Sequence, residues 1–283
     1  MIHIDRASVP EPTRFAKRAR AAHRELAGLI KDSGSKLNQR KLPFDDRLLE
    51  ADDLRQSLRQ LFKGRCAFCE SPLTPSHQLV THFRPRERAA QLDGKVSPLH
   101  YWWLAYDWAN LYLSCADCLS AKGKRFPVRG RRTAQPGSGK GSTSDEKALL
   151  LDPCRDDPES ELEFLEDGTV RSSTERGRVT IDVFGLNRIA LVNARRDYCE
   201  RTDAVGDLFL VDNEPLKWTE PNFLAALFTE VPDDWGYRAL ITQQARRHLA
   251  RATTVEQGTD RCVQRVERGA SVRGRDLAAP DSN

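Results

Sequence analysis

Two pairs of cysteines with metal-ligand spacing are the strongest chemical signal in the sequence. Cys66 and Cys69 are separated by two residues, Cys115 and Cys118 repeat that spacing, and 45 residues lie between the pairs. Each C-x-x-C turn presents two thiolates on one side, and two such turns can close a tetrahedral shell around Zn²⁺. A redox role, in which one pair opens a helix of a thioredoxin-like unit, accounts for one pair and leaves the other unused. We therefore predict a structural zinc site with four cysteine ligands.

The rest of the composition is that of an ordinary folded protein. The chain has 283 residues, of which 39% are hydrophobic and 30% charged, enough for one large domain or two small ones. Cys154, Cys199 and Cys262 lack a partner at ligand spacing, and we expect ordinary thiols there. No apolar stretch approaches the ~20 residues of a transmembrane helix, and residues 1–6 carry charge where a signal peptide would be apolar. We therefore expect a cytoplasmic protein without membrane contact.

Shorter motifs surround the cysteine pairs. Between the pairs the chain reads His82-Phe-Arg-Pro85 and then Trp108-Ala-Asn-Leu111, and Lys122 and Phe126-Pro127 follow the second pair. In this order the motifs resemble those of the zinc-braced HNH, or ββα-metal, endonucleases. Segments further downstream are similar to the HNH subunit of Septu-type and retron antiphage systems, namely those that carry Glu146, Leu149 to Pro158 and Gly185 to Arg188. The resemblance covers most of residues 60–200.

The resemblance implies a fold and a reaction. The fold is α+β, with a zinc-braced ββα-metal (HNH) core at residues 64–128 embedded in a mainly helical scaffold with a small hairpin. The reaction is hydrolysis of DNA phosphodiester bonds with one Mg²⁺ or Mn²⁺ ion, in which His82 is the general base. Asn110 holds the catalytic loop in shape, and four cations would lie against phosphate: Arg84, Lys122, Lys124 and Arg125. The implied partner is an ABC/SMC-like ATPase.

Two positions depart from the family pattern. The residue before the catalytic histidine is ordinarily Asp or Glu, the residue after the last zinc cysteine is ordinarily Asn or His, and both bind the cation. Here they are Thr81 and Leu119. A threonine hydroxyl is a poor Mg²⁺ ligand and leucine has no ligand atom, so we expect weakened cation binding and impaired cutting unless Asp117, His77 or His100 substitutes. The alternative is a catalytically degenerate HNH-fold subunit that binds DNA or regulates an ATPase complex.

Helical periodicity predicts the elements that precede the core. Apolar residues recur at helical spacing within residues 13–41, and a second helix is predicted from Asp45 or Asp46 to about Phe62. Residues 1–63 are therefore interpreted as basic N-terminal helices. Residues 129–147 are rich in Gly, Ser and Arg, and we expect a flexible basic loop there.

The second half of the chain is predicted to be mainly helical. An acidic hairpin is expected around Asp167-Gly168, followed by one helix from Asn187 to Leu208 and another from about Tyr237 to Arg251. These elements make up a region at 148–252. Residues 253–283 are polar and lack apolar periodicity, so we expect a disordered tail.

The net charge of +4 is a sum of opposite local charges. Residues 13–41 balance to +7, residues 117–147 to +5 and residues 152–167 to −7. A solvated helix face and a phosphate-binding face explain the first stretch equally well, whereas the second has the stronger claim to phosphate because it starts at the site. The acidic stretch should face away from any polyanion. Trp102, Trp103 and Trp108 are expected to pack beside the zinc core rather than to stack on bases.

Overall fold

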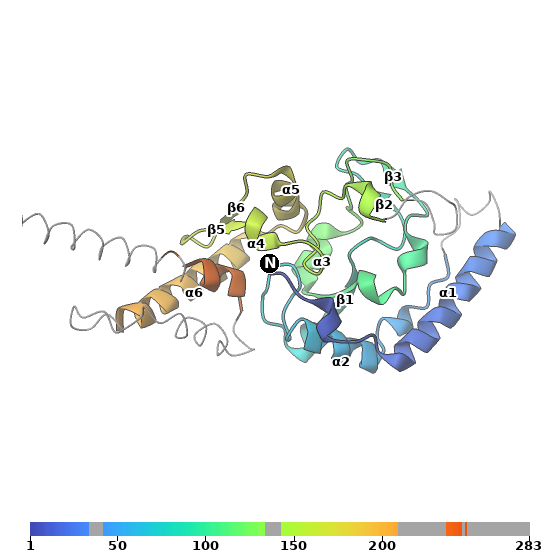
Figure 1. The fold of residues 1–283 in the computed structure, drawn as a ribbon, viewed down its shortest axis with the longest axis horizontal. Helices are drawn as coiled ribbons and strands as arrows, with labels where there is room; N and C mark the ends of the chain where they lie inside the picture. The colour runs from blue at the N-terminus through green and yellow to red at the C-terminus, as the bar shows by residue number, and fades with distance from the viewer. Residues whose placement is uncertain (34–41, 134–142, 209–235, 245–246, 248–283) are drawn as a thin grey trace, which may run out of the picture. The chain divides into compact units, whose positions relative to one another are not determined.

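The computed structural model describes residues 1–33, 42–133, 143–208, 236–244 and 247 (Figure 1). The chain divides into two compact units, Met1–Leu240 and Ile241–Asn283, and every candidate site residue belongs to the first. In the second unit, the described residues 241–244 and 247 are helical. The predicted tail at 253–283, Cys262, residues 134–142 of the predicted loop and the end of the helix predicted to reach Arg251 lie outside the described residues.

Two helices form the N-terminal part of the first unit. Helix α1 (Thr13–Ser33) buries Phe15, Ala19 and Leu26, which confirms the predicted amphipathic helix. Its exposed residues include six of the predicted cations, namely Arg14, Lys17, Arg18, Arg20, Arg24 and Lys31. A short 3-10 turn, η1 (Arg6–Ser8), precedes it.

The second predicted helix begins later than expected. Helix α2 spans Asp52–Leu61, and the residues before it form a separate 3-10 turn, η3 (Asp46–Leu48), capped by Asp45. Helix α2 is joined to α1 at this end, because the Asp53 carboxylate accepts a hydrogen bond of 2.8 Å from the Phe15 amide in the first turn of α1. The prediction of one helix from Asp45 or Asp46 is therefore wrong at its start, whereas its apolar face, with Leu54 and Leu58 fully buried, is confirmed.

The segment that carries the candidate site folds as two antiparallel strands followed by a helix. Strand β1 (Leu79–His82) pairs with β4 (Leu111–Ser114), with Thr81 opposite Tyr112 and His82 opposite Leu111. Helix α3 (Ala116–Lys122) follows β4 directly. A short 3-10 turn, η4 (Pro75–His77), precedes β1. The connection from β1 to β4 contains a small hairpin that we did not predict, formed by β2 (Ala89–Ala90) and β3 (Val96–Ser97). Two 3-10 turns follow it, η5 (Trp102–Leu104) and η6 (Trp108–Asn110).

The acidic region folds as predicted, as a small hairpin followed by helices. Strand β5 (Glu163–Phe164) pairs with β6 (Val170–Arg171), and Gly168 in their turn has a φ of +83°. A side chain at Gly168 would also meet the Val192 carbonyl oxygen at 2.2 Å, so the turn requires glycine. The remaining elements here are η7 (Thr143–Glu146), α4 (Pro158–Glu161), α5 (Glu175–Val183) and α6 (Ile189–Leu208), the last of which confirms the predicted helix.

Aromatic side chains join these elements around β4. Tyr112 is fully buried and packs against Phe62 next to α2, Phe68 between the first cysteines and Phe83 after β1, with ring centroids 5.6–5.7 Å apart. Phe68 also stacks on Phe184 at 4.2 Å, which ties the region after α5 to the same core. The three tryptophans near the site are at most 9% exposed, which confirms that they pack. The fold is mixed α+β and mostly helical with small hairpins, and no helix among the described residues is long and apolar enough to cross a membrane.

Candidate metal centre and catalytic groups

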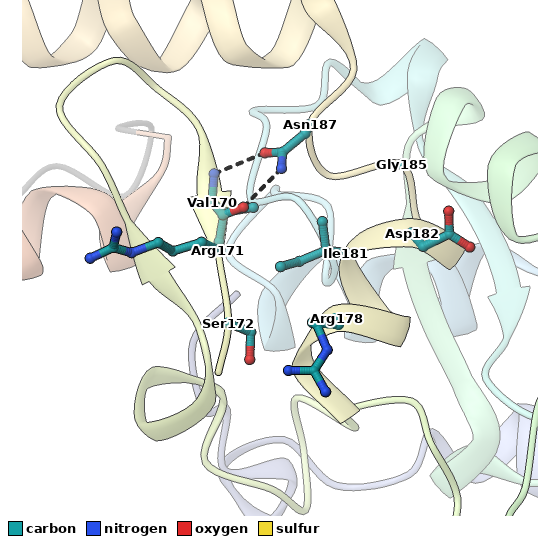
Figure 2. A pocket seen from close by; sticks show the side chains of 8 residues that line it. All are labelled: Val170, Arg171, Ser172, Arg178, Ile181, Asp182, Gly185 and Asn187. Atoms are coloured by element: carbon teal, nitrogen blue, oxygen red, sulfur yellow. Dashed lines mark hydrogen bonds between the residues drawn. The ribbon is translucent and has the colours of Figure 1, made fainter. Parts of the chain in front are cut away.

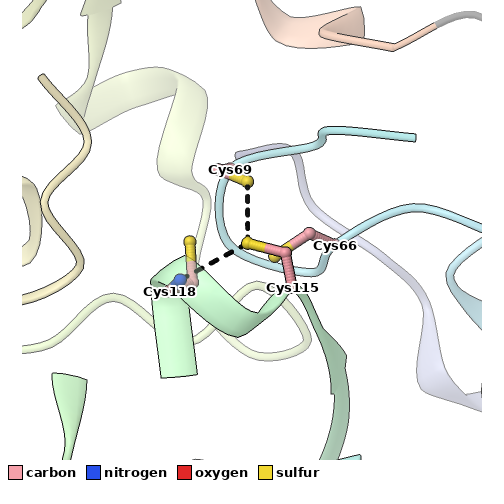
Figure 3. Close-up of side chains that lie close together, drawn as sticks. All are labelled: Cys66, Cys69, Cys115 and Cys118. Carbon is pink, nitrogen blue, oxygen red and sulfur yellow. Dashed lines mark hydrogen bonds between the residues drawn. The ribbon is translucent and has the colours of Figure 1, made fainter. Parts of the chain in front are cut away.

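The two cysteine pairs, which are 45 residues apart in sequence, meet in one cluster (Figure 3). The four Sγ atoms lie within 4.8 Å of one another, and those of Cys69 and Cys115 are 3.7 Å apart. A tetrahedron of Zn–S bonds of about 2.3 Å places its sulfur atoms roughly 3.8 Å apart. The donor set and the spacing therefore fit a zinc ion. Among the described residues, no other group of three or more His, Cys, Asp or Glu side chains could hold a metal ion.

Each pair is held by the backbone around it. The first pair lies in a tight turn after α2, in which the Cys66 amide donates to the Ser71 carbonyl at 3.0 Å and the Glu70 amide to the Cys66 carbonyl at 2.9 Å. In the second pair, Cys115 is the N-cap of α3, and its sulfur accepts from the Cys118 amide at 3.4 Å. The Ala67 amide bonds to the Leu113 carbonyl of β4 at 2.9 Å, which brings the two pairs together.

The thiols of the cluster titrate in opposite directions. Hydrogen bonding within the cluster, first of all with Cys115, lowers the pKa of the Cys69 thiol, whereas burial raises the pKa of the Cys66 thiol. A bound dication would resolve this conflict, because it would hold all four sulfurs as thiolates.

An arginine 70 residues after Cys118 contacts the same sulfurs. The Arg188 guanidinium donates to three of them, to Cys69 at 3.6 Å and to Cys115 and Cys118 at 3.7 Å each. Its Nε lies 3.4 Å from a carboxylate oxygen of Asp117, so Asp117 supports this contact. Four thiolates and Zn²⁺ carry a net charge of −2, which the arginine partly balances. This role of Arg188 was not predicted from the sequence, although Arg188 ends one of the motifs that carry the family resemblance.

His82 ends β1 with one ring nitrogen engaged. Its Nε2 donates a hydrogen bond of 2.8 Å to the Ala105 carbonyl, which leaves Nδ1 unprotonated in the neutral ring. Among the described residues, Nδ1 has no hydrogen-bond partner. Burial, aided by the charges of Arg86, Lys122 and Lys124, lowers the pKa of His82 to about 3, so the ring is neutral at physiological pH. A neutral imidazole with one free nitrogen is able to accept a proton.

Asn110 holds the chain that follows His82. Its side-chain oxygen accepts from the Arg84 amide at 2.8 Å, and its side-chain nitrogen donates to the carbonyls of Arg84 at 2.9 Å and Leu104 at 3.1 Å. Asn110 is 3% exposed, so these bonds are protected from water. The side chain therefore fixes the backbone on both sides of the His82 ring.

Two of the four cations predicted to meet phosphate are inside the protein. Arg84 is 7% exposed, and its Nε lies 2.9 Å from the carboxylate of the fully buried Glu146. The other oxygen of Glu146 accepts from the Thr133 amide at 2.8 Å. This internal ion pair argues against a phosphate contact by Arg84. No role was predicted for Glu146 from the sequence, although its motif is part of the resemblance.

The second internal cation is Lys122, the last residue of α3, which is 2% exposed. Burial, followed by the charges of Lys124 and Arg125, lowers the pKa of Lys122 to about 7. The two neighbours are partly exposed: Lys124 lies 3.5 Å from Glu87, and Arg125 lies 3.4 Å from Asp182. Arg125 also donates to the Val183 carbonyl at 3.0 Å, which joins α3 to the end of α5.

The residues that could replace the missing cation ligands are engaged elsewhere. Thr81 is 5% exposed within β1, and Leu119 is partly buried in α3. Asp117 pairs with Arg188, as described above. His77 bonds to Thr74 at 2.6 Å in η4, and the His100 ring packs edge-on against Tyr101 and Trp103. The side chains around His82 therefore do not fit the divalent cation of an HNH site.

A surface pocket of about 500 Å³ lies apart from these groups (Figure 2). It lies between β6 and α5, and Arg171, Arg178 and Asp182 are among the side chains that line it. Asn187 forms one side through two hydrogen bonds of 2.8 Å with the Val170 backbone. None of the predicted site residues lines this pocket, so it does not mark the candidate site.

Comparison with known proteins identifies two relatives, both from Bacillus mycoides (strain KBAB4). The chain is 31% identical to the Septu protein PtuB over 203 residues, which are 69% of this chain and 66% of that protein. It is also 32% identical to the Septu protein PtuA over 163 residues, which are 57% of this chain and 23% of PtuA. No family model matches the chain. The chain is therefore a distant relative of the Septu proteins, and it spans less than two thirds of the length of either one.

Proposed function

We propose that this relative of the Septu protein PtuB is an HNH-type DNA endonuclease of an antiphage defence system, in which zinc has a structural role. The observation that carries the proposal is the position of His82. It ends the first strand of a β1–β4–α3 unit, its Nε2 is fixed by the Ala105 carbonyl and its Nδ1 is free among the described residues. A strand, a strand and a helix clamped at one end by four cysteines is the arrangement expected of a zinc-braced ββα-metal core.

In this proposal, His82 is the general base. Nδ1 takes a proton from the water that attacks the phosphorus, and the Ala105 carbonyl stabilises the charged ring that results. Asn110 is a positioning residue, because its buried side chain bonds to the backbone of the loop after His82. When bound, zinc would hold the first knuckle to the start of α3 and thereby keep β1 and α3 in place.

The DNA surface is assigned to exposed cations. Six lysines and arginines of α1 are exposed, and no ion-pair partner for them is found among the described residues. Lys124 adds a partly exposed cation close to His82, whose pKa it helps to lower. Cations of this kind bind the DNA backbone without reading its sequence.

A large partner is supported by the match to PtuA. In that relative, a segment similar to this chain makes up 23% of a longer protein, so it is covalently joined to a much larger remainder. We propose that this chain acts with a separate large partner that corresponds to this remainder, namely an ABC/SMC-like ATPase. The exposed faces of the N-terminal helices are candidate docking surfaces.

Plasmid nicking by the purified chain, with and without such an ATPase, tests the proposal. We expect wild type to nick supercoiled DNA, and His82→Ala to be slower by about 10²–10⁴-fold, the usual contribution of a general base. His3→Ala is the matched control, because His3 is an exposed histidine whose ring bonds to the Asp156 carbonyl. Equal rates for wild type and His82→Ala would contradict the assignment.

A second candidate function is favoured by Thr81 and Leu119, which leave no side-chain ligand for a divalent cation. In that case, the chain would bind DNA or regulate an ATPase without cutting. Wild type that binds DNA but does not nick it with Mg²⁺, with Mn²⁺ or without added metal would support this function. Cutting that appears only in Thr81→Glu/Leu119→Asn would support it further, since that variant restores both ligand types.

A further inference from the structure

Lys122 is a buried cation for which the described part of the chain supplies no counter-ion. It is 2% exposed, and among the described residues no acceptor lies within hydrogen-bond or ion-pair distance of its ammonium group. Among the other buried cations of the described chain, Arg84 pairs with the Glu146 carboxylate. Arg132 bonds to the Tyr101 hydroxyl and Arg195 to the Leu186 carbonyl at 2.7 Å, although each of these two also has a buried nitrogen without a partner. An unpaired buried charge destabilises a protein, so a lysine kept in such a place indicates a functional role.

The position of Lys122 in the fold indicates that role. It lies three residues after Leu119, so both occupy one face of α3, one turn apart. Its charge is also close enough to contribute to the lowered pKa of His82. Lys122 therefore shares a face of α3 with Leu119, and its positive charge acts on the His82 ring.

We propose that the Lys122 ammonium group takes the place of the divalent cation, so that this site hydrolyses phosphodiester bonds without a catalytic metal. The inference rests on the nuclease function proposed above and names the group that would serve it. A positive charge beside the scissile phosphate stabilises the charge that develops on its oxygens, as a cation would. A phosphate would also supply a counter-ion, which Lys122 does not find among the described residues.

The step balances with water as the only co-reactant. The water oxygen forms a new bond to phosphorus and passes one proton to His82 Nδ1. The bond between phosphorus and the departing sugar oxygen breaks, and that oxygen takes a proton from Lys122. His82 then releases its proton to solvent and Lys122 regains one, so both groups return to their starting states.

The test measures nicking of supercoiled DNA by the full chain, with its partner where required, in EDTA and in Mg²⁺. Zinc content is checked after each incubation. We expect equal wild-type rates in both conditions, and a loss of about 10²-fold or more in Lys122→Met. Lys122→Met should also melt at a higher temperature than wild type, because it fills the same space without a buried charge. Lys95→Met is the control for charge, because the Lys95 side chain is 84% exposed and pairs with Asp93.

The other outcomes distinguish a failure of the role of Lys122 from a failure of the nuclease function. Wild-type cutting that requires Mg²⁺ and survives in Lys122→Met would overturn the role of Lys122 and leave the nuclease function standing. Lost cutting together with a lower melting temperature would indicate a structural role and would also overturn it. No cutting by wild type in either condition would overturn both proposals. If the inference is right, adding Thr81→Glu and Leu119→Asn to Lys122→Met should restore cutting in Mg²⁺ only.

Discussion

The two ends of helix α3 differ in how completely their charges are satisfied. At its start, Cys115 and Cys118 join two other cysteines in a cluster that fits zinc, and Arg188 donates to three of the sulfurs. At its end, Lys122 is 2% exposed, and no partner for it is found among the described residues. The charges at the start of the helix therefore have partners without substrate, whereas the charge at its end would gain a partner from a bound anion.

The largest expected effect is at the zinc end. Cys115→Ser should abolish the cooperative unfolding transition, because structural zinc contributes about 10–16 kcal/mol in small zinc domains, which matches or exceeds the typical stability of a folded domain. Thermal unfolding followed by near-UV circular dichroism, together with elemental analysis for zinc, measures this. Cys154→Ser is the control, because Cys154 is a free cysteine outside the cluster. Less than about half an equivalent of zinc in wild type would contradict the site.

A smaller effect is expected at the arginine that covers the cluster. Arg188→Gln should weaken zinc binding by about 10–100-fold, which is usual when a residue that hydrogen-bonds to the metal ligands is replaced. The zinc affinity of Arg188→Lys should lie between those of wild type and Arg188→Gln. Competition with a chromogenic chelator gives the affinity. Arg178→Gln is the matched control, since Arg178 is exposed on α5 and donates to the Ser173 carbonyl instead. Equal affinities in the two glutamine variants would show that the sulfur contacts do not matter for the metal.

Local patterns made the zinc end predictable and left the other end largely hidden. The cysteines of a zinc knuckle are separated by two residues in the sequence. The pairs Cys66/Cys69 and Cys115/Cys118 therefore indicated the cluster without knowledge of the fold. The hairpin at Asp167-Gly168 and helix α1 were predicted for the same reason. The β2–β3 hairpin carried a similar signal in Asp93-Gly94, with Gly94 at a φ of +81°, and was overlooked.

Contacts between distant residues account for what the sequence could not show. Arg84 reads as a surface cation until Glu146, 62 residues later, is placed beside it. Asp53 of α2 accepts a hydrogen bond from the Phe15 amide of α1, 38 residues earlier. Lys122 belongs to a basic stretch that predicts phosphate contact at the surface, and only the fold shows that it is buried. A lysine or arginine in a basic stretch of sequence is therefore not always exposed to solvent.

The pH dependence of cutting should distinguish the two ends further. The active form needs neutral His82, present above about pH 3, and charged Lys122, which is lost as pH rises through about 7. The charged groups that act on Lys122 are Lys124 and Arg125, and both favour proton loss. The rate should therefore fall about tenfold per pH unit well above pH 7. A rate that rises with pH over this range would contradict Lys122 as the acid.

Stability should change in the opposite direction over the same range. Because the pKa of Lys122 is about 7 in the folded state and 10.5 without the fold, the unfolded chain binds more protons between these values. The destabilising effect of this lysine therefore shrinks as pH rises from about 7 to about 10. The difference in melting temperature between Lys122→Met and wild type should narrow accordingly, whereas a constant difference would mean that Lys122 titrates normally.

The smallest expected effect concerns the face of α1, whose cations are exposed and which the sequence assigned equally to solvent or to phosphate. If Arg18 and Arg20 each meet one phosphate, Arg18→Gln/Arg20→Gln should reduce the slope of log affinity against log salt by about 1.8. Fluorescence anisotropy with duplex DNA over a range of salt concentrations measures the slope. Lys95→Gln, which removes an exposed charge beside Asp93, should leave it unchanged. An unchanged slope in the double variant would assign this face to solvent and leave DNA contact to cations nearer His82, so the slope decides which basic surface meets DNA.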